Sequence, residues 1–300
     1  MNLWANNKLR LAITSKCNIN CFYCHNDGQP RDSIHMSDGL FNLITDSLTV
    51  SGNLPEIITF TGGEPLTHPN IFHFIKTVRP FCNSCVIVTN GILLSKSIIK
   101  RLIFSGITTF RLGIDSFYRA RSRPSHSWTN TFSAIDTVNY LLKLKTKVEI
   151  NTVLTDFNKL EIPMIVNFCY NNKINLKIFE HINVSNHGNP KKKGTIVSQP
   201  VSKFEDFHEL IINCLPHINH NESLDYGACN YCYWDEQFEL RYCKYLCDYK
   251  LCYLSGTRID ANGYVFICMK NRGQFRLNIE KPFLTERIIT NALEAGCYNR

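Results

Sequence analysis

Six short β-rich runs alternate with longer amphipathic stretches between residues 8 and 215, and this alternation limits the fold more than any other feature. The runs predict strands over 9–14, 56–61, 85–89, 108–114, 147–154 and 175–181. The stretches predict helices over 38–50, 70–79, 95–105, 131–144, 159–171 and 202–215. Because this spacing is typical of parallel βα units, we expect an open or closed α/β barrel with ligands at the carboxyl ends of its strands.

The βα rhythm stops after residue 216, where a stretch rich in cysteine and tyrosine begins. We therefore expect two domains, a barrel over 1–215 and a small cysteine-rich C-terminal domain over 216–300. The length of 300 residues and the hydrophobic share of 44% are enough for a sizeable core. Segment 185–194 is a loop by composition.

Charge and cysteine content narrow the class of protein. Lys and Arg total 33 against 25 Asp and Glu, and the net charge of +8 favours anionic partners without choosing among them. The chain shows neither an apolar run of the ~20 residues that a membrane helix needs nor a secretory signal, so we expect a soluble, cytoplasmic protein without membrane contact. In that compartment its 14 cysteines favour metal ligation over disulfides.

Three of the cysteines, Cys17, Cys21 and Cys24, follow the first predicted strand within one short loop. A loop can turn three successive thiolates toward a common centre, so the three can hold one iron–sulfur cluster. Zinc would take a fourth protein ligand, and His25 is adjacent. Three thiolates alone leave one metal position open, and an open iron is a binding site.

The pattern Cys-x3-Cys-x2-Cys at the end of a first strand resembles the radical S-adenosylmethionine (SAM) enzymes. The resemblance implies a partial (β/α)6 barrel of TIM type and a [4Fe-4S] cluster whose free iron binds the amine and carboxylate of SAM. It also implies an electron donor such as flavodoxin or ferredoxin. In that family the reduced cluster cleaves SAM to a 5'-deoxyadenosyl radical, which removes hydrogen from an unreactive carbon.

The segment Thr61-Gly62-Gly63-Glu64-Pro65 follows the second strand, where the family carries a Gly-Gly-Glu-Pro turn. Glycines let the backbone approach a ligand closely, and the Glu64 carboxylate can accept a hydrogen bond from the SAM ammonium. Alone, the segment would be an ordinary β-turn. The resemblance also implies that other polar residues near the strand ends surround SAM: Tyr23, Thr89, Asn90, Asp115, Ser116 and Asn151.

Two further cysteines, Cys252 and Cys268, flank a predicted hairpin whose turn is Asp260-Ala-Asn-Gly263. This spacing resembles the SPASM/twitch subgroup of radical SAM enzymes and implies an auxiliary [4Fe-4S] cluster. Its implied ligands are Cys243, Cys247, Cys252 and Cys268. The alternative is a zinc knuckle formed by Cys229, Cys232, Cys243 and Cys247. Only Cys297 remains downstream, which favours the twitch form with one auxiliary cluster.

Within this subgroup the chain resembles the GTP 3',8-cyclases of molybdenum-cofactor biosynthesis, in segments 9–11, 149–154, 177–180 and 258–260. Arg10 and Arg258 match basic positions that face the substrate there, although each is equally consistent with a structural ion pair. At other positions the chain departs from that family: Ile57, Thr59 and Glu149 stand where the family carries basic residues. A triphosphate would meet less positive charge here, and the family's Gly-Gly tail is replaced by 296–300.

We expect a radical SAM enzyme with an auxiliary cluster that oxidises or rearranges a small polar metabolite, such as a nucleoside, sugar or amino-acid derivative. GTP cyclisation and a peptide-modifying maturase of a ribosomal natural product are alternatives. Only 16 residues precede Cys17, so no fused leader-peptide-binding domain is expected. A zinc-bound nucleic-acid-binding protein is a further alternative, suggested by aromatic residues among the cysteines, although acidic residues interrupt them. The aromatic residues are Tyr231, Tyr233, Trp234, Tyr242 and Tyr245.

Overall fold

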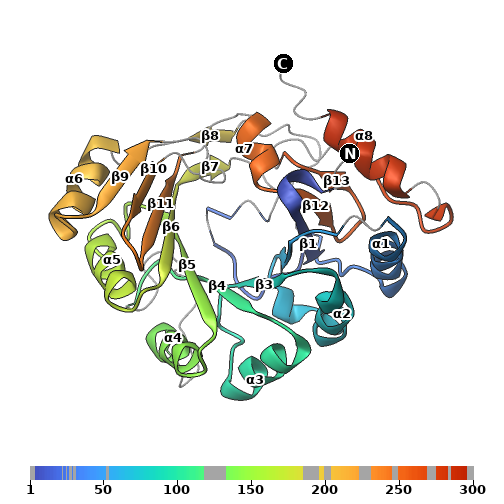
Figure 1. The fold of residues 1–300 in the computed structure, drawn as a ribbon, viewed down its shortest axis with the longest axis horizontal. Coiled ribbons are helices and arrows are strands. Elements are labelled where there is room, and N and C mark those ends of the chain that lie inside the picture. The colour runs from blue at the N-terminus through green and yellow to red at the C-terminus, as the bar shows by residue number, and fades with distance from the viewer. Residues whose placement is uncertain are drawn as a thin grey trace.

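The structure is a computed structural model. It describes residues 4–21, 23–24, 26, 29, 32–51, 54–117, 133–184, 196–198, 204–222, 231–244, 249–268, 275–282 and 285–295. Within these residues an eleven-stranded sheet runs in the order β13-β12-β1-β2-β3-β4-β5-β6-β11-β10-β9. The sheet is strongly curved, with helices α1 to α5 along its outer side (Figure 1).

Six parallel strands form the centre of this sheet. They are β1 (Lys8–Thr14), β2 (Ile57–Gly62), β3 (Ser84–Thr89), β4 (Thr109–Gly113), β5 (Lys147–Leu154) and β6 (Asn175–Glu180). The helices that follow them are α1 (Asp38–Ser51), α2 (Ile71–Val78), α3 (Lys96–Ser105), α4 (Ala134–Lys143), α5 (Ile162–Asn171) and α6 (Phe204–Cys214). The predicted partial barrel of βα units is thereby confirmed.

Local sequence signals explain where two of these helices begin. Ser133 caps α4, because its side chain accepts from the Asp136 backbone while the Asp136 carboxylate accepts from the Ser133 backbone. The helix therefore begins later than the predicted residue 131, and residues 131–132 lie outside the described residues. Proline in the first turn of α5 fixes its start at Ile162.

Strands from the C-terminal third extend the sheet at both edges. At one edge β12 (Thr257–Asp260) pairs parallel with β1, and β13 (Val265–Phe266) follows antiparallel. At the other edge β11 (Glu239–Cys243) pairs parallel with β6, followed antiparallel by β10 (Tyr231–Trp234) and β9 (Asn219–Glu222). A division near residue 215 stays a prediction.

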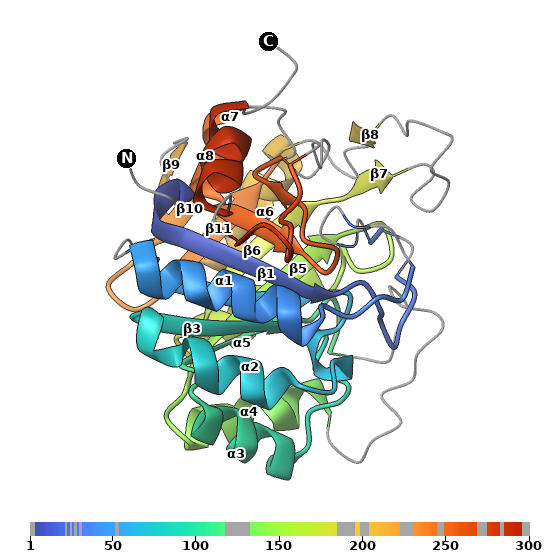
Figure 2. The ribbon, with the colours of Figure 1, turned by 90° about the vertical axis from the view of Figure 1, so that its right-hand side faces the viewer.

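The remaining elements surround this sheet. β7 (Ile182–Val184) and β8 (Ile196–Ser198) form a separate antiparallel pair, and the predicted loop 185–194 lies outside the described residues. Helices α7 (Tyr249–Leu254) and α8 (Thr285–Ala295) belong to the C-terminal part. In the side view α8 lies above β1, and β1 and β3 point toward the same side (Figure 2). Among the described residues, the helices are all too short or too polar to span a bilayer.

The predicted hairpin turn after β12 is confirmed. Gly263 has a φ of 83°, a left-handed conformation that glycine adopts without strain. The Asp260 carboxylate accepts from the backbone N–H groups of Asn262 and Tyr264, at 2.9 and 3.0 Å. These bonds satisfy the turn and return the chain antiparallel into β13.

The two faces of the curved sheet differ in burial. On β5 the outward side chains of Val148 and Ile150 are buried in the core, whereas Glu149 and Asn151 on the inner face remain partly exposed. The same alternation holds over the first four residues of β1 and of β6. Burial of each large outward side chain contributes about 1.5–3 kcal/mol. The helix-facing layer therefore stabilises the fold, and the inner face is left for polar residues.

Candidate active site

The cysteine loop begins directly after β1. Cys17, Cys21 and Cys24 lie on it as thiols rather than in disulfides, and the Cys24 backbone N–H donates to Cys21 O at 3.2 Å. Burial raises the pKa of the Cys17 thiol to about 11, and the negative charges of Glu64, Cys24 and Cys21 add to the increase. The three thiols thus lie within electrostatic reach of one another. In the described part of the chain they are not drawn together closely enough to form a three-ligand metal group.

The glycines of the Gly-Gly-Glu-Pro turn lie against the backbone of this loop. A Cβ on Gly62 would come within 2.2 Å of Thr14 O, and one on Gly63 within 2.2 Å of Lys16 O. The Gly63 N–H donates to Thr14 O at 2.7 Å. Only glycine permits this approach, so the turn holds the start of the cysteine loop against the end of β2.

Glu64 is fully buried and joins the ends of two strands. Its Oε1 accepts from Thr89 Oγ1 at 2.8 Å and from the Leu66 backbone at 3.1 Å, and its Oε2 accepts from the Asn90 backbone at 2.8 Å. These groups use three of the roughly four acceptor positions of a carboxylate. Pro65 begins the short 3-10 helix that follows. The contact of Glu64 with a SAM ammonium stays a prediction.

Asn90 connects the end of β3 to the cysteine loop. Its side-chain amide donates to Asn18 Oδ1 at 2.8 Å and lies 3.9 Å from the Cys17 sulfur. Thr89, buried beside it, accepts from the Gly91 backbone at 3.0 Å. The structure therefore brings together the predicted residues Cys17, Glu64, Thr89 and Asn90.

Asp115 connects the end of β4 to the same loop. Its Oδ2 accepts a hydrogen bond from the Tyr23 hydroxyl, and its Oδ1 accepts from the Val153 backbone at 2.8 Å. The neighbouring Ser116 hydroxyl donates to Glu161. Tyr23 thus reaches the predicted site through its hydroxyl, whereas Ser116 is bonded to the start of α5.

Asn158 is a buried residue that holds Asp115 in place and was not predicted from the sequence. Its side-chain amide donates to Asp115 O and Val153 O, both at 2.9 Å, and its Oδ1 accepts from the Thr155 backbone at 2.8 Å. These bonds fix Asp115 against the end of β5. The available signal was the Thr-Asp-Phe-Asn stretch, because Asn favours such side-chain-to-backbone turns.

Asn151 lies on the inner face of β5, in register with Lys177 of β6. Its Oδ1 is buried, and no hydrogen-bond partner for it is found among the residues that the structure describes. A buried acceptor in this state is suited to a ligand donor. This observation supports the prediction that Asn151 faces a bound molecule.

The two predicted substrate contacts are neighbours. Arg10 of β1 pairs in register with Arg258 of β12, so the two side chains lie side by side. Arg258 is 5% exposed, and its Nη1 donates to Ile267 O at 2.6 Å, which ties it to the returning segment of the hairpin. A structural role for Arg258 is therefore present, and a substrate contact by either arginine stays a prediction.

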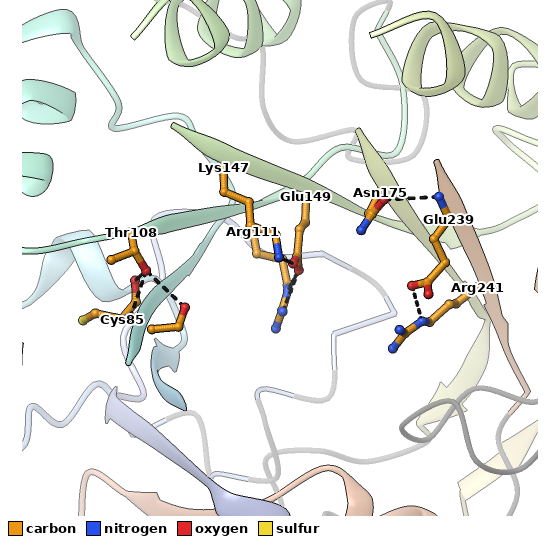
Figure 3. A network of polar contacts seen from close by, with 9 residues as sticks. Cys85, Thr108, Arg111, Lys147, Glu149, Asn175, Glu239 and Arg241 are labelled. Carbon is orange, nitrogen blue, oxygen red and sulfur yellow. Dashed lines mark hydrogen bonds and ion pairs between the residues drawn. The ribbon is translucent and has the colours of Figure 1, made fainter. Parts of the chain in front are cut away.

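A charged network lines the opposite side of the inner face (Figure 3). Arg111 of β4 donates from Nε and Nη2 to Glu149 Oε2 of β5, at 2.8 and 2.6 Å. Arg241 of β11 forms an ion pair with Glu239 at 2.5 Å. Burial alone would raise the pKa of Glu149, but the Arg111 charge and hydrogen bonds hold it below its usual value. Burial lowers the pKa of Lys177 to about 7, and the charges of Arg111 and Arg241 add to this decrease.

From the sequence, Glu149 was identified only as a departure from the basic residue of the GTP 3',8-cyclases, and the cations beside it were not predicted as site residues. The period-two pattern of β4 to β6 places these residues on the polar face and so was the available signal.

The implied auxiliary ligands are placed only in part. Cys252 lies on α7, and Cys268, 3% exposed, follows β13. Cys243, at the end of β11, is disulfide-bonded, and Cys247 lies outside the described residues. Cys232 is buried on β10, and its zinc-knuckle partner Cys229 is likewise not described. Both the auxiliary cluster and the zinc alternative stay predictions.

The fold and the site together define a partial-barrel enzyme with a three-cysteine loop at the carboxyl ends of its strands. The family model of the Radical SAM superfamily matches residues 11–180, more than half of the chain, and the chain belongs to this superfamily. The superfamily uses a [4Fe-4S] cluster together with SAM, which confirms the predicted enzyme class, the SAM-binding cluster and SAM itself.

The residues on the cysteine loop fit these groups. Three soft thiol donors follow β1 on one short loop, and bound iron would supply the positive charge that draws them together as thiolates.

Curated relatives match more than half of the chain. GTP 3',8-cyclase of Clostridium perfringens SM101 is 31% identical over 179 residues, which cover 57% of this chain and 54% of the relative. GTP 3',8-cyclase of Campylobacter jejuni subsp. doylei is 28% identical over 181 residues, which cover 58% and 55%. The chain spans about half the length of the curated relatives that it matches.

Solved structures match most of the chain. Streptococcus suis SuiB bound to precursor peptide SuiA has a TM-score of 0.64 at 17% identity, covering 93% of this chain and 63% of that one. The structure of anSMEcpe with bound AdoMet and Cp18Cys peptide has a TM-score of 0.59 at 17% identity, covering 96% and 82%. At these identities the likeness shows the shared fold alone.

Proposed function

We propose that the chain is a radical SAM enzyme that removes hydrogen from a small polar metabolite, such as a nucleoside, sugar or amino-acid derivative. The observation that carries this proposal is the contact set of Glu64, Asn90 and Tyr23–Asp115, which ties the cysteine loop to the ends of β2, β3 and β4. The set lies within the family-matched residues 11–180. A [4Fe-4S] cluster and SAM, when bound, supply a 5'-deoxyadenosyl radical.

The chain's own residues bind and orient these groups. Cys17, Cys21 and Cys24 hold the cluster, and the Glu64 carboxylate accepts from the SAM ammonium. The surrounding residues orient the rest of SAM: Tyr23, Gly62, Gly63, Pro65, Thr89, Asn90, Asp115, Ser116 and Asn151. The barrel wall keeps water and other hydrogen donors away from the reacting carbon.

A twitch-type segment over 216–300 completes the proposed enzyme. Cys247, Cys252 and Cys268 would hold an auxiliary [4Fe-4S] cluster that aids oxidation or rearrangement of the substrate. Cys243 would join them as the fourth ligand only after reduction of its disulfide to the thiolate. Supporting this, β11 and β12 attach two parts of this segment to the opposite outer strands of the barrel, β6 and β1. An electron donor such as flavodoxin or ferredoxin reduces the SAM-binding cluster.

The proposal is tested with anaerobically reconstituted enzyme, SAM and dithionite, by chromatography of 5'-deoxyadenosine. Wild-type protein is expected to bind iron and sulfide and to form 5'-deoxyadenosine, and Cys17→Ala to form none. Cys214→Ala is the matched control, because Cys214 ends α6 outside the described polar contacts of the site. A colourless zinc protein, or an iron-loaded protein that never cleaves SAM, would overturn the proposal. The colourless zinc protein would favour the zinc-bound nucleic-acid-binding alternative.

Two substrate alternatives have specific support. Similarity to SuiB and anSMEcpe, both solved with peptides, supports a peptide-modifying maturase. The cyclase relatives support a GTP substrate. Incubating the active enzyme separately with candidate precursor peptides, GTP and pools of small metabolites, and following mass changes, separates the three. A mass change in a peptide or in GTP alone would replace the small polar metabolite as the substrate.

A further inference from the structure

Four cations from four strands meet on the inner face of the barrel, and we call Lys8, Arg111, Lys177 and Arg241 the interior cation cluster. Lys177 pairs in register with Arg241 on one side and with Asn151 on the other. The charges of Arg111, Arg241 and Lys8 all lower the pKa of Lys177, which shows that the four are electrostatic neighbours. Glu149 is the carboxylate that acts in the opposite direction.

The carboxylates on this face do not balance the cluster. Glu149 pairs with Arg111, and Glu239 pairs with Arg241. Lys8 donates to the backbone oxygen of Leu254 at 3.3 Å, and the carboxylate that supports its charge, Glu56, lies on an exposed position and has the smallest effect. Within the cluster, the two lysines therefore have no ion-pair partner among the described residues, whereas each arginine has one. Cations held partly away from water are costly unless an anion joins them.

The surface around the cluster is open to a ligand. The side chains of Arg111 and Glu149 are 17% and 16% exposed, and those of Arg241 and Glu239 are 26% and 29% exposed. A packed barrel interior would leave these inner-face side chains buried. Figure 3 shows Arg111, Glu149 and Arg241 directed into the same interior space.

We propose that the interior cation cluster binds a doubly charged oxyanion group of the substrate, of the phosphate monoester type. With Lys177 protonated, the two lysines of the cluster match two negative charges, whereas one carboxylate would leave a charge unbalanced. A guanidinium has five N–H donors, of which Glu149 takes two from Arg111, so further donors remain for oxyanion acceptors.

The proposal also orients the substrate, and it rests on the proposed function because it locates one end of that enzyme's substrate. Lys177 neighbours Asn151, which is among the residues assigned to SAM. The anionic end then lies deeper in the barrel than the cysteine loop, and the reacting carbon lies nearer the mouth. The buried Asn151 Oδ1, a contact for SAM, then lies beside the anionic end of the substrate. A phosphorylated metabolite whose reacting carbon lies away from the phosphate has this arrangement.

The test measures binding of methyl phosphate, sulfate and acetate to the reconstituted, SAM-loaded enzyme by titration calorimetry. We expect saturable 1:1 binding of methyl phosphate and sulfate, each about tenfold or more tighter than acetate. Lys177→Met is expected to weaken both by about tenfold, and Lys177→Arg to retain binding. Lys143→Met, which removes an exposed charge from α4, is the matched control.

Each outcome decides one claim. Absence of saturable anion binding, equal losses in Lys177→Met and Lys143→Met, or acetate binding as tightly as sulfate would overturn the proposal. Far-UV circular dichroism of each variant separates lost binding from lost folding, and Lys177→Arg repeats the test with the charge kept. Formation of 5'-deoxyadenosine is measured on the same wild-type sample. If the enzyme cleaves SAM but binds no anion, this inference alone fails. If the enzyme binds the anion but does not cleave SAM, the proposed function fails.

Discussion

Replacing Glu149 by Gln tests whether the interior charges contribute to stability as the geometry implies. Glutamine keeps the size of the side chain but removes the negative charge that lies 2.6 Å from Arg111 Nη2 and 3.5 Å from Lys147 Nζ. Lys177 also loses the carboxylate that supports its charge. The variant leaves several cations facing one another without their common counter-ion, so we expect it to be less stable.

The size of the effect follows from the burial of the pair. Breaking a buried ion pair costs about 3–5 kcal/mol, and the remaining exposure of 16–17% lowers the expected loss to about 2–4 kcal/mol. Unfolding entropy near 2.1 cal/mol/K per residue gives about 0.6 kcal/mol/K for a chain of this length. The Tm of Glu149→Gln should therefore fall by about 3–6 °C.

The assay is thermal unfolding of anaerobic holoenzyme at neutral pH and low salt, followed by far-UV circular dichroism. Arg111→Met and the double variant complete a double-mutant cycle, in which we expect a coupling energy of about 1–3 kcal/mol. Sulfate should raise the Tm of Glu149→Gln more than that of wild type, because the anion replaces the lost charge. A Tm within 1 °C of wild type would correspond to a loss of only about 0.6 kcal/mol. Such a small loss, or stability changes of the two single variants that add up to that of the double variant, would refute the reasoning.

The pH dependence of the same variant has a definite sign. The folded-state pKa of Glu149 lies below its usual value of 4.5, so its stabilising contribution is complete above that value. The contribution is lost as pH falls through the lower, folded-state pKa. The Tm difference between wild type and Glu149→Gln should therefore be constant near neutral pH and should narrow below about pH 4.5.

Three further predictions concern other parts of the site. Gly63→Ala should lose SAM cleavage and most iron of the first cluster, because its Cβ would lie 2.2 Å from Lys16 O; normal iron content would contradict this. Cys268→Ala should lower iron per protein by about half, measured by colorimetric analysis, and unchanged iron would exclude it as a ligand. Sulfate affinity should fall as pH rises through about 7, where Lys177 loses its proton, and should stay level in Lys177→Arg; calorimetry at several pH values checks this.

The sequence predicted the barrel well because each βα unit carries its own periodicity and boundary signals. The alternation on β5 and the capping box before α4 are local features that tertiary context did not override. Strands β9 to β11 were missed for the opposite reason. They are short, without helices between them, and β11 joins β6 from a distance of some 60 residues along the chain. Local patterns do not encode such pairings.

The residues of the candidate site were likewise predicted where a local motif marks them and missed where only tertiary contacts do. Gly63 and Glu64 were predicted as ligand-approaching residues from their motif, and the structure adds that both also bond the cysteine loop or the end of β3. The bonds of Asn158 to Asp115 and of Tyr23 to Asp115 depend on the folding of separate loops onto one strand end. A motif identifies which residues are chemically suited to a site, whereas these supporting contacts follow only from tertiary structure.

The interior cation cluster shows how register changes the meaning of a substitution. Read along the chain, Glu149 in place of a basic residue argues against an anionic substrate. In the sheet, Arg111 lies directly opposite Glu149 on the neighbouring strand and neutralises it, and Lys177 and Arg241 face each other on the next pair. The positive charge has moved to neighbouring strands rather than disappeared. The substrate preference of such a barrel therefore depends on the summed charge of its inner face, so that Glu149→Gln and Lys177→Met should shift sulfate affinity in opposite directions.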